Sequence, residues 1–258
     1  MNDSVTPSEE TYPIATLAQA TIALADVPKL RRQPTGTTGH ALVLRHADEQ
    51  TLAALVAVRR AAEARGWSAD DMRDFAVIAS PRFFGRTGTA TIVHRFRQQG
   101  PIGVSPMGIP SLSLHSPSGT ISVILGMHGP NFGVGGGPNH VADGFLTALA
   151  LHRDRLAPVI WLVLTAYESE PLLDAEGRCG TPAHIHAVAM ALTTQAVAQA
   201  PWSLRVQPSR AKTEAAPILN EIMTFVNSER ERWSCPLVGD LVIELQRHAV
   251  PSNAAIAA

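Results

Sequence analysis

The chain has 258 residues, enough for one large domain or two small ones. Its 45% of hydrophobic residues excludes an intrinsically disordered chain. A net charge of -1 argues against a nucleic-acid-binding surface and against a polybasic membrane patch. The longest apolar run, residues 158–166, has about half of the roughly 20 residues that a membrane helix needs.

The N-terminus and the cysteines favour a cytoplasmic protein. Residues 1–10 are polar and acidic, so we expect no signal peptide. Cys179 and Cys235 do not suggest a disulfide framework, which favours a reducing compartment. We expect no cofactor, no metal site, no membrane and no nucleic-acid partner.

Hydrophobic periodicity and helix and strand breakers predict the elements of the first half of the chain. We expect a tail over residues 1–12, a strand over 41–45, a helix that Asp48 caps and Gly66 ends, a strand over 74–79 that Ser80-Pro81 ends, a helix over 85–99, an irregular segment over 100–110 and a helix over 116–126.

The second half continues the alternation of strands and helices. We expect a helix from Asn139, strands over 158–166, 183–192 and 203–207, a helix from Thr213 with Pro217 in its first turn, and a strand or a helix over 237–245. The apolar residues of 158–166 are consecutive, which predicts a strand buried on both faces. The alternation implies a layered α/β protein with a mixed or parallel sheet.

A glycine-rich segment is the most informative part of the chain: GPNFGVGGGPNHVADG, residues 129–144. A dinucleotide-binding fingerprint does not fit, because the spacing that starts at Gly133 and Gly135 requires a glycine where Pro138 stands. A nucleophile elbow fits better, with a strand, a tight turn of small residues and then a helix. Such a turn needs glycines for its strained backbone, and the helix N-terminus favours a thiolate or another negative charge.

The surroundings of this elbow resemble the N-terminal half of the β-ketoacyl synthases. The resemblance rests on the runs IGVSPMGIP (residues 102–110) and SGTISVILGMHGPN (residues 118–131) and on the helix and strand that follow, and it covers roughly residues 41–192. It implies an α/β, thiolase-like layered fold, the N-terminal half only, with a mixed sheet flanked by helices. We expect residues 1–30 to be a tail and a lead-in segment, and residues 31–258 to be a single ketosynthase-like N-terminal domain.

The resemblance also implies that the nucleophile is missing. In the family a cysteine lies in the elbow immediately before the helix, and its place falls here on Pro138, or on Gly137 or Asn139 after a slip of one residue. None of the three is a nucleophile. In the family the N–H of this cysteine helps to bind the oxyanion, and proline has no N–H. Loss of one oxyanion donor costs about 100- to 1,000-fold in rate.

The family's catalytic histidines and lysine lie in a second half, which does not fit into residues 193–258. The resemblance therefore implies a non-catalytic accessory subunit, similar to a chain-length factor, in a polyketide- or fatty-acid-type pathway such as an aryl-polyene-like one. The expected partners are a ketosynthase or a second copy of the chain, together with an acyl carrier protein.

Two other functions stay open. One is an independent enzyme that uses His140 as a base or His184 and His186, which share a strand face, as zinc ligands. The other is an acyl- or carrier-protein-binding module. The histidines have ordinary structural interpretations too, as a first-turn residue and as residues of a half-buried strand. For substrate binding the candidates are Phe132, His128 and His140.

Arginines gather in the first half of the chain, at Arg59, Arg60, Arg82, Arg95 and Arg97. Such a surface could steer an acidic carrier protein. The alternative is that these arginines lie on ordinary solvated helix faces.

The resemblance finally implies a dimer. In the family the strand that leads into the elbow, here residues 131–135, pairs with its copy across a two-fold axis. A short glycine-rich edge strand exposes unpaired N–H and C=O groups, so we expect it to be covered in a homodimer or by a ketosynthase. An obligate interface of this kind buries on the order of 2,000 Å² or more.

Overall fold

The computed structural model describes residues 10–32, 38–171, 174–175, 184–194, 200–208, 218–237 and 241–248. Within them, the strands are β1 (Glu10–Ala23), β2 (Ala76–Pro81), β3 (Asn131–Gly133), β4 (Val159–Glu168), β5 (His184–Thr193), β6 (Trp202–Pro208), β7 (Arg232–Pro236) and β8 (Leu241–Arg247). They form one sheet in the order β3-β2-β4-β5-β1-β6-β8-β7. β3, β2 and β4 are parallel and the other neighbours are antiparallel, which confirms the mixed α/β sheet.

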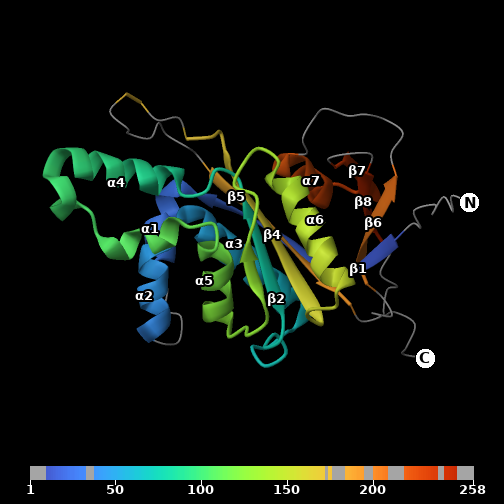
Figure 1. Cartoon of the computed structure of the whole chain (residues 1–258). Helices are drawn as coiled ribbons and strands as arrows, with labels where there is room; N and C mark the ends of the chain where they lie inside the picture. Colours follow the sequence, from blue (N-terminus) through green and yellow to red (C-terminus); the bar gives the residue numbers. More distant parts are fainter. Residues whose placement is uncertain are drawn as a thin grey trace, which may run out of the picture.

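Helices cover both faces of this sheet (Figure 1). They are α1 (Val27–Leu30), α2 (Thr38–His46), α3 (Glu49–Arg65), α4 (Arg86–Gln99), α5 (Ser116–Leu125), α6 (His140–Arg153) and α7 (Leu219–Asn227), with the short 3-10 helices η1 (Leu24–Asp26), η2 (Gly100–Gly103), η3 (Pro106–Gly108) and η4 (Pro110–Leu112). α3 and α5 pack on one face, and α6 and α7 on the other. No helix in the described ranges has the length and apolar character needed to cross a membrane.

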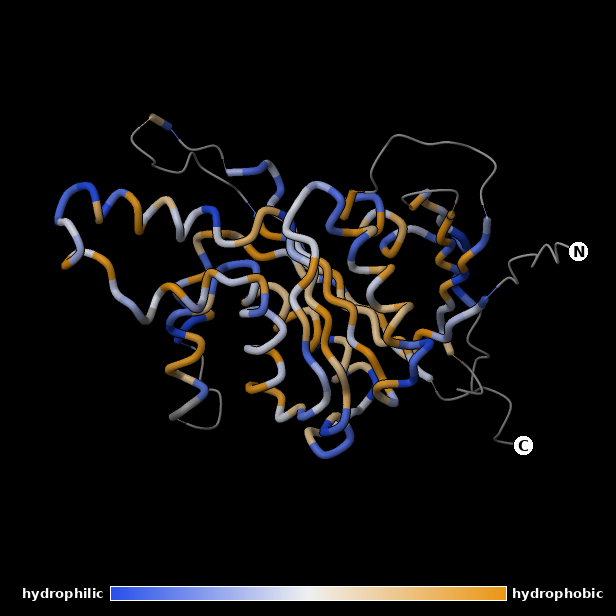
Figure 2. Tube along the Cα trace, viewed as in Figure 1, coloured by the Kyte–Doolittle hydropathy of each residue, from blue (hydrophilic) through white to orange (hydrophobic). Residues whose placement is uncertain are grey.

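The core is organised around β4, which is buried on both faces of the sheet as its consecutive apolar residues predict. Trp161 and Val163 join the cluster on the α3 and α5 side. Ile160, Leu162 and Leu164 join the cluster on the α6 and α7 side. Figure 2 shows the hydrophobic residues concentrated in these central strands. Burial on two faces therefore fixes β4 between the two helical layers.

The predicted boundaries of α3 are confirmed. Asp48 is its N-cap, and the Asp48 side chain accepts a hydrogen bond from the N–H of Gln50 at 2.8 Å. A cap of this kind contributes about 1 kcal/mol to stability. Gly66 ends the helix with a φ of 72°, a left-handed conformation that glycine adopts without steric cost. The helices expected between residues 85 and 153 also form, as α4, α5 and α6.

Two expectations for the N-terminal part are wrong. Residues 41–45 belong to the helix α2 and not to a strand: Leu44 is buried while Leu42 is 61% exposed, so one side of a helix packs on the body. Periodicity cannot separate a helix from a strand in so short an apolar run. Residues 10–12 belong to β1 and not to a tail, because β5 and β6 hold β1 between them. Residues 1–9 lie outside the described residues.

The C-terminal elements extend the sheet. The strands expected over 183–192 and 203–207 form as β5 and β6, and the unassigned segment 237–245 contains most of β8. α7 begins at Leu219; Thr213 and Pro217, at the expected start of this helix, lie outside the described residues. The domain boundary between residues 30 and 31 stays a prediction, although β1 lies before it and contributes a strand to the sheet.

The close packing of β3 predicts different effects of alanine at two glycines. A Cβ on Gly133 would overlap the backbone carbonyl of Leu114, whereas a Cβ on Gly137 meets no atom within 4 Å. Gly133→Ala should therefore lower the free energy of unfolding by about 1–3 kcal/mol. Gly137→Ala should change it by less than about 0.5 kcal/mol. Urea unfolding measures both, and equal losses would contradict the packing of β3 on residue 114.

Candidate functional site

The elbow expected from the sequence is present at one edge of the sheet. In the described part of the chain, β3 has β2 as its single neighbouring strand, with Asn131 opposite Val77. After β3 the chain turns through residues 134–139 and enters α6. Gly135 and Gly136 have φ angles of 74° and 89°, which residues with a Cβ rarely adopt. The arrangement of strand, tight turn and helix is therefore confirmed.

Hydrogen bonds fix this turn to the end of β2. The backbone bonds are Val134 N–H to Ala79 C=O (2.9 Å), Gly136 N–H to Pro81 C=O (3.1 Å) and Phe83 N–H to Gly136 C=O (3.2 Å). In addition, Ser80 Oγ donates to the carbonyl of His140 at 2.6 Å. The turn is thus held at the carboxyl ends of the parallel strands, where open α/β sheets bind their ligands.

Pro138 and Asn139 are the exposed residues of the turn just before α6. Asn139 is the N-cap of α6, but its side chain makes no capping hydrogen bond. Pro138, at the position that the resemblance assigns to the nucleophile, has neither a nucleophilic atom nor a backbone N–H. Gly137 has no side chain. The turn therefore presents no nucleophilic side chain to solvent.

His140, the candidate base, is the first residue of α6 and is 1% exposed. Within the described part of the chain, neither ring nitrogen has a hydrogen-bond partner. Burial lowers the pKa of His140 to about 4; the backbone of Pro138 opposes this effect, and the positive charge of Arg82 adds to it. His140 is therefore a neutral imidazole beneath the turn. This placement counts against a role as a base that touches substrate.

The three residues considered for substrate binding do not come together. His128 precedes β3, at the opposite end of the strand from the elbow. The backbone N–H of His128 donates to the backbone carbonyl of Arg73 at 2.6 Å. Phe132 lies on β3 and is 40% exposed. His140 is buried behind the turn. Their roles in binding stay predictions.

A charged cluster that the sequence analysis missed lies where β2 and β4 end. Arg82 Nε is 3.2 Å from one oxygen of Glu170, and Arg86 Nη1 is 3.2 Å from the other. Both guanidinium groups lie over the ring of Phe83, at 5.5 Å and 4.3 Å from its centroid. Burial raises the pKa of Glu170, and the two arginines oppose this effect. The local sequence does not predict this cluster, because 84 positions separate Arg86 from Glu170.

His184 and His186 both approach Glu168 on the neighbouring strand β4. His184 Nδ1 and His186 Nε2 lie 3.4 Å and 3.1 Å from the same Glu168 oxygen. His186 Nδ1 also shares a hydrogen bond of 2.9 Å with the hydroxyl of Thr21. Among the described residues, no group of three or more His, Cys, Asp or Glu is arranged to hold a metal ion. The geometry thus gives the two histidines a hydrogen-bonding role between strands.

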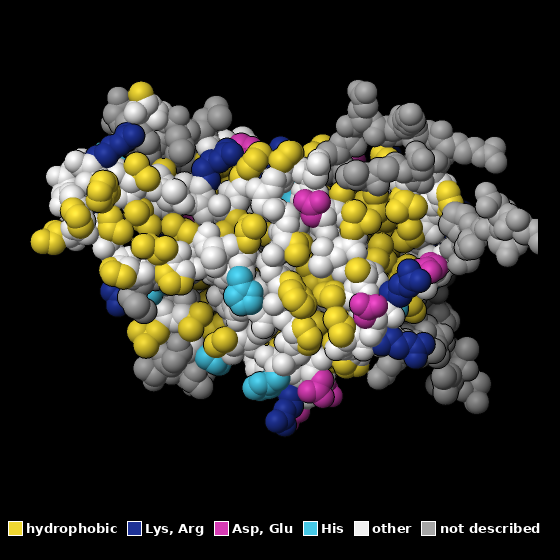
Figure 3. All heavy atoms as spheres, in the orientation of Figure 1, with side chains coloured by type: hydrophobic (Ala, Val, Ile, Leu, Met, Phe, Trp, Pro, Cys, Tyr) yellow, Lys and Arg dark blue, Asp and Glu magenta, His cyan; other side chains and the backbone are white. Residues whose placement is uncertain are grey.

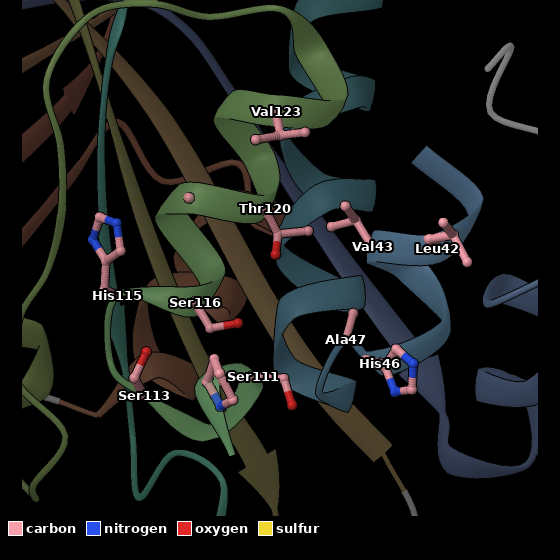
Figure 4. Close-up of a pocket in the computed structure, with 12 residues that line it drawn as sticks. Leu42, Val43, His46, Ala47, Ser111, Ser113, His115, Ser116, Thr120 and Val123 are labelled. Atoms are coloured by element: carbon pink, nitrogen blue, oxygen red, sulfur yellow. The ribbon is translucent and has the colours of Figure 1, made fainter. Parts of the chain in front are cut away.

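A pocket of about 490 Å³ lies between α2, η4 and α5 (Figure 4). Leu42, Val43 and Val123 give it apolar walls, and His46 and His115 lie on opposite sides of it. Among the described residues, no Asp, Glu, Lys or Arg lines it. Small-molecule sites are typically apolar cavities of about 300–1,000 Å³. The sequence does not predict this pocket, because residues 41–45 suit a strand where α2 forms one wall.

The pocket adjoins the elbow through one short segment. Ser113 and His115 line the pocket, and Leu114 lies between them in the chain. The backbone of Leu114 packs on Gly133, and its side chain packs on Gly136 in the turn. The same segment therefore forms part of the pocket wall and supports the elbow.

Cys235 is not positioned as a nucleophile. It is buried on β7, and burial raises the pKa of its thiol to about 12, with the charge of Glu221 acting in the same direction. The thiolate is the reactive form, so this thiol is inert near neutral pH. Cys179 lies outside the described residues.

Solved ketosynthase structures share the fold. The complex AntDE:AntF, a type II polyketide synthase acyl-carrier protein with its ketosynthase, has a TM-score of 0.53 and 15% identity, with 72% of this chain and 63% of that chain covered. The ishigamide ketosynthase/chain length factor has a TM-score of 0.52 and 15% identity, with 78% and 68% covered. The ketosynthase from module 1 of the bacillaene synthase of Bacillus amyloliquefaciens FZB42 has 0.52 and 13%, with 83% and 50% covered.

These similarities show that the chain has a ketosynthase-type, thiolase-like α/β fold, as the sequence resemblance implied. No protein-family model and no curated protein matches the sequence. The chain spans 63%, 68% and 50% of the lengths of the three structures, so it corresponds to a part of that fold. That this part is the N-terminal half stays a prediction.

The burial of His140 predicts a pH effect on stability. The pKa of His140 is about 4 in the fold against 6.5 for an exposed histidine. Between these pH values the unfolded chain binds a proton that the folded chain excludes, so stability falls as the pH falls from 6.5 to 4. The loss from this group is about 3 kcal/mol. The contribution of His140 is obtained by measuring the free energies of unfolding of the wild type and of His140→Leu at pH 7.5 and at pH 4.5.

At pH 7.5, His140→Leu should be neutral or stabilising by about 1 kcal/mol, because it removes two unpartnered buried nitrogens. At pH 4.5 the advantage of the variant should increase. His128→Leu, at an exposed histidine, is the control and should not change the comparison. An unchanged difference between the wild type and His140→Leu at the two pH values would contradict the burial of a neutral imidazole.

Proposed function

We propose that the chain is a non-catalytic, ketosynthase-like accessory subunit of a polyketide- or fatty-acid-type pathway, with an aryl-polyene-like pathway among the candidates. In this proposal it acts in the cytoplasm and pairs with a ketosynthase or with a second copy of itself. An acyl carrier protein brings the pathway's acyl groups to the assembly.

One observation carries this proposal: the elbow combines a strand, a tight glycine turn and a helix, and it carries Pro138 where the resemblance places the nucleophile. A cysteine there would supply both a thiol and an oxyanion-binding N–H. Proline removes the two together, and the N–H alone is worth about 100- to 1,000-fold in rate. The geometry of the turn is kept while its reactive groups are absent, which favours a structural or regulatory role.

The comparisons support a choice of partners. One neighbour is described as a ketosynthase/chain length factor, and another as a ketosynthase in complex with its acyl-carrier protein. These are properties of those proteins. They make a ketosynthase and a carrier protein the first partners to test for this chain.

The edge of the sheet supports pairing through β3. Phe132 on β3, Val123 on α5 and Leu146 on α6 are apolar residues with 40%, 53% and 36% of their surface exposed. α5 precedes β3 and α6 follows it, and the two helices pack on opposite faces of the sheet. Exposed apolar residues beside unpaired backbone groups are typical of a covered surface.

The pocket favours a second candidate function, an acyl-binding module on the same scaffold. Its apolar, uncharged lining suits a neutral acyl chain, and it adjoins the elbow through residues 113–115. An independent enzyme that uses His140 or the pair His184 and His186 has weaker support. His140 is 1% exposed, and the other two histidines are engaged with Glu168.

The proposal predicts that the wild-type chain does not form an acyl-enzyme. After incubation with acetyl- or malonyl-carrier protein, intact-mass spectrometry should show the unmodified mass, because no thiol occupies the elbow. A competent ketosynthase treated in parallel is the positive control. A stable acyl adduct within residues 129–145 would overturn the proposal, and an adduct on Cys179 or Cys235 would place the active site elsewhere.

Pro138→Cys is the matched variant for this experiment. It places a thiol before the N-terminus of α6, where the helix dipole favours the thiolate, and it restores the N–H. We expect this variant to gain an acyl adduct that the wild type lacks. Failure to acylate the folded variant would count against residue 138 as the nucleophile position.

The proposed pairing predicts a pattern of amide protection along β3. Val77 N–H donates to Pro130 C=O and Val134 N–H to Ala79 C=O. Because bonding groups alternate along a strand, the N–H groups of Asn131 and Gly133 face the open edge. Hydrogen exchange should show them protected in the assembled protein. Val134 is the internal reference, since its bond lies within one chain.

Phe132→Glu should then dissociate the assembly, because the two-fold axis would bring buried, unpaired charges together. Ile218→Glu, at a 44% exposed residue before α7, is the matched control and should not dissociate it. Light scattering measures the homodimer and co-purification measures the complex with a ketosynthase. Fast exchange at Gly133 together with a monomeric wild type would exclude pairing through β3.

A further inference from the structure

α4 projects from the body of the molecule, and the chain returns from it through η2, η3 and η4 (Figure 1). We call residues 86–112 the α4 arm. Of the 14 residues of α4, Ala90 is the buried one. A helix with so little buried surface gains little stability from the core of its own chain. Its exposed side chains are therefore available to a partner.

The charge around this arm is one-sided. Residues 75–142 contain no Asp or Glu, although the whole chain has 22 of them and a net charge of -1. The same stretch contains Arg82, Arg86, Arg95 and Arg97. The arm carries no carboxylate of its own, and the carboxylates that approach it, Glu49 and Glu170, contact its first residues, Thr87 and Arg86. The positive charges farther along α4 therefore attract an acidic surface and speed its association.

The structure separates the arginines that the sequence places in one cluster. Arg82 and Arg86 bind Glu170, and the Arg60 guanidinium donates to the Gln19 carbonyl at 3.0 Å. Arg95 and Arg97 are exposed on α4, and no ion pair with another described residue is found for either. On the arm, these two positive charges are therefore open to another molecule, whereas Arg59 lies half-buried on α3, outside the arm.

Apolar side chains lie on the same arm. Val93 and Phe96 on α4 are 43% and 53% exposed, and Ile102 on η2 is 95% exposed. Figure 3 shows hydrophobic side chains gathered over this side of the molecule, with Lys and Arg side chains along its upper rim. An exposed aromatic residue between two arginines combines the apolar contact and the charge that protein interfaces favour.

We propose that the α4 arm is a docking surface for an acidic protein that presents an amphipathic helix. Carboxylates on the rim of that helix would pair with Arg95 and Arg97, and its apolar ridge would cover Phe96 and Val93. An acyl carrier protein has this chemistry. The identity of the partner therefore rests on the proposed function, whereas the surface itself does not.

The test uses the full chain and a defined probe. The probe is a fluorescein-labelled, stapled helix of about 18 residues with Glu on its flanks and Leu along one face. Fluorescence anisotropy measures its affinity at about 50 mM and about 300 mM salt. We expect binding that weakens as the salt rises. Arg95→Glu/Arg97→Glu should lower the affinity by about tenfold or more at low salt. Phe96→Ser should lower it at both salt concentrations.

Arg230→Glu/Arg232→Glu is the matched control, with the same change of net charge at exposed arginines around β7. It should leave the affinity within about twofold of the wild type. Circular dichroism confirms that each variant folds. No binding of the probe, equal losses in the two double variants, or equally strong Phe96-dependent binding of a DNA duplex of the same charge would overturn the proposal.

The outcome is independent of the elbow. If the probe does not bind but Phe132→Glu still dissociates the assembly, the docking surface fails and the proposed function stands. If the wild type forms an acyl-enzyme at residues 129–145 while the probe binds through Arg95 and Arg97, the proposed function fails and the docking surface stands.

Discussion

The attachment of the elbow turn to the end of β2 is the constraint on which the rest of the site depends. Three backbone hydrogen bonds and the bond from Ser80 Oγ to the His140 carbonyl hold residues 134–140 in one place. The close approach requires glycine at Gly133 and left-handed backbone at Gly135 and Gly136. Once the turn is placed, α6 starts at a fixed point, Pro138 reaches the surface and His140 is forced beneath it. The exposed proline and the buried histidine are thus two consequences of one backbone path.

The sequence predicts the fold well where local signals and burial agree. β4 is apolar at every position that the sheet buries except Thr165, and α3 carries both a capping aspartate and a terminal glycine. Prediction fails where neighbours decide. Half of β1 is Ala and Thr, and the strand is stabilised by β5 and β6 on its two sides. The apolar run of α2 suits a strand equally well. The burial of Leu44 against the rest of the molecule shows that this run forms one face of a helix.

In the candidate site, too, the sequence predicts local features and fails to predict features that depend on distant residues. The place of Pro138 follows from counting along the chain, because the elbow is a local motif. The burial of His140 does not, since it depends on β2 and on a serine 60 positions away. Arg82 and Arg86 contact Glu170, and His184 and His186 approach Glu168. Each contact joins parts of the chain that are distant in the sequence. The pocket could not be found from the sequence either, because one of its walls is the misassigned α2.

The turn would keep its shape without any catalytic role. Its glycines and hydrogen bonds serve the junction of β2, β3 and α6, and substitution of a reactive side chain at position 138 removes none of them. A proline there adds rigidity, because its ring fixes φ just before the helix begins. The same junction presents the open edge of β3 and supports the segment that lines the pocket. These contacts depend on the backbone of residues 133–136 and on Ser80, so the side chain at position 138 can change without altering them.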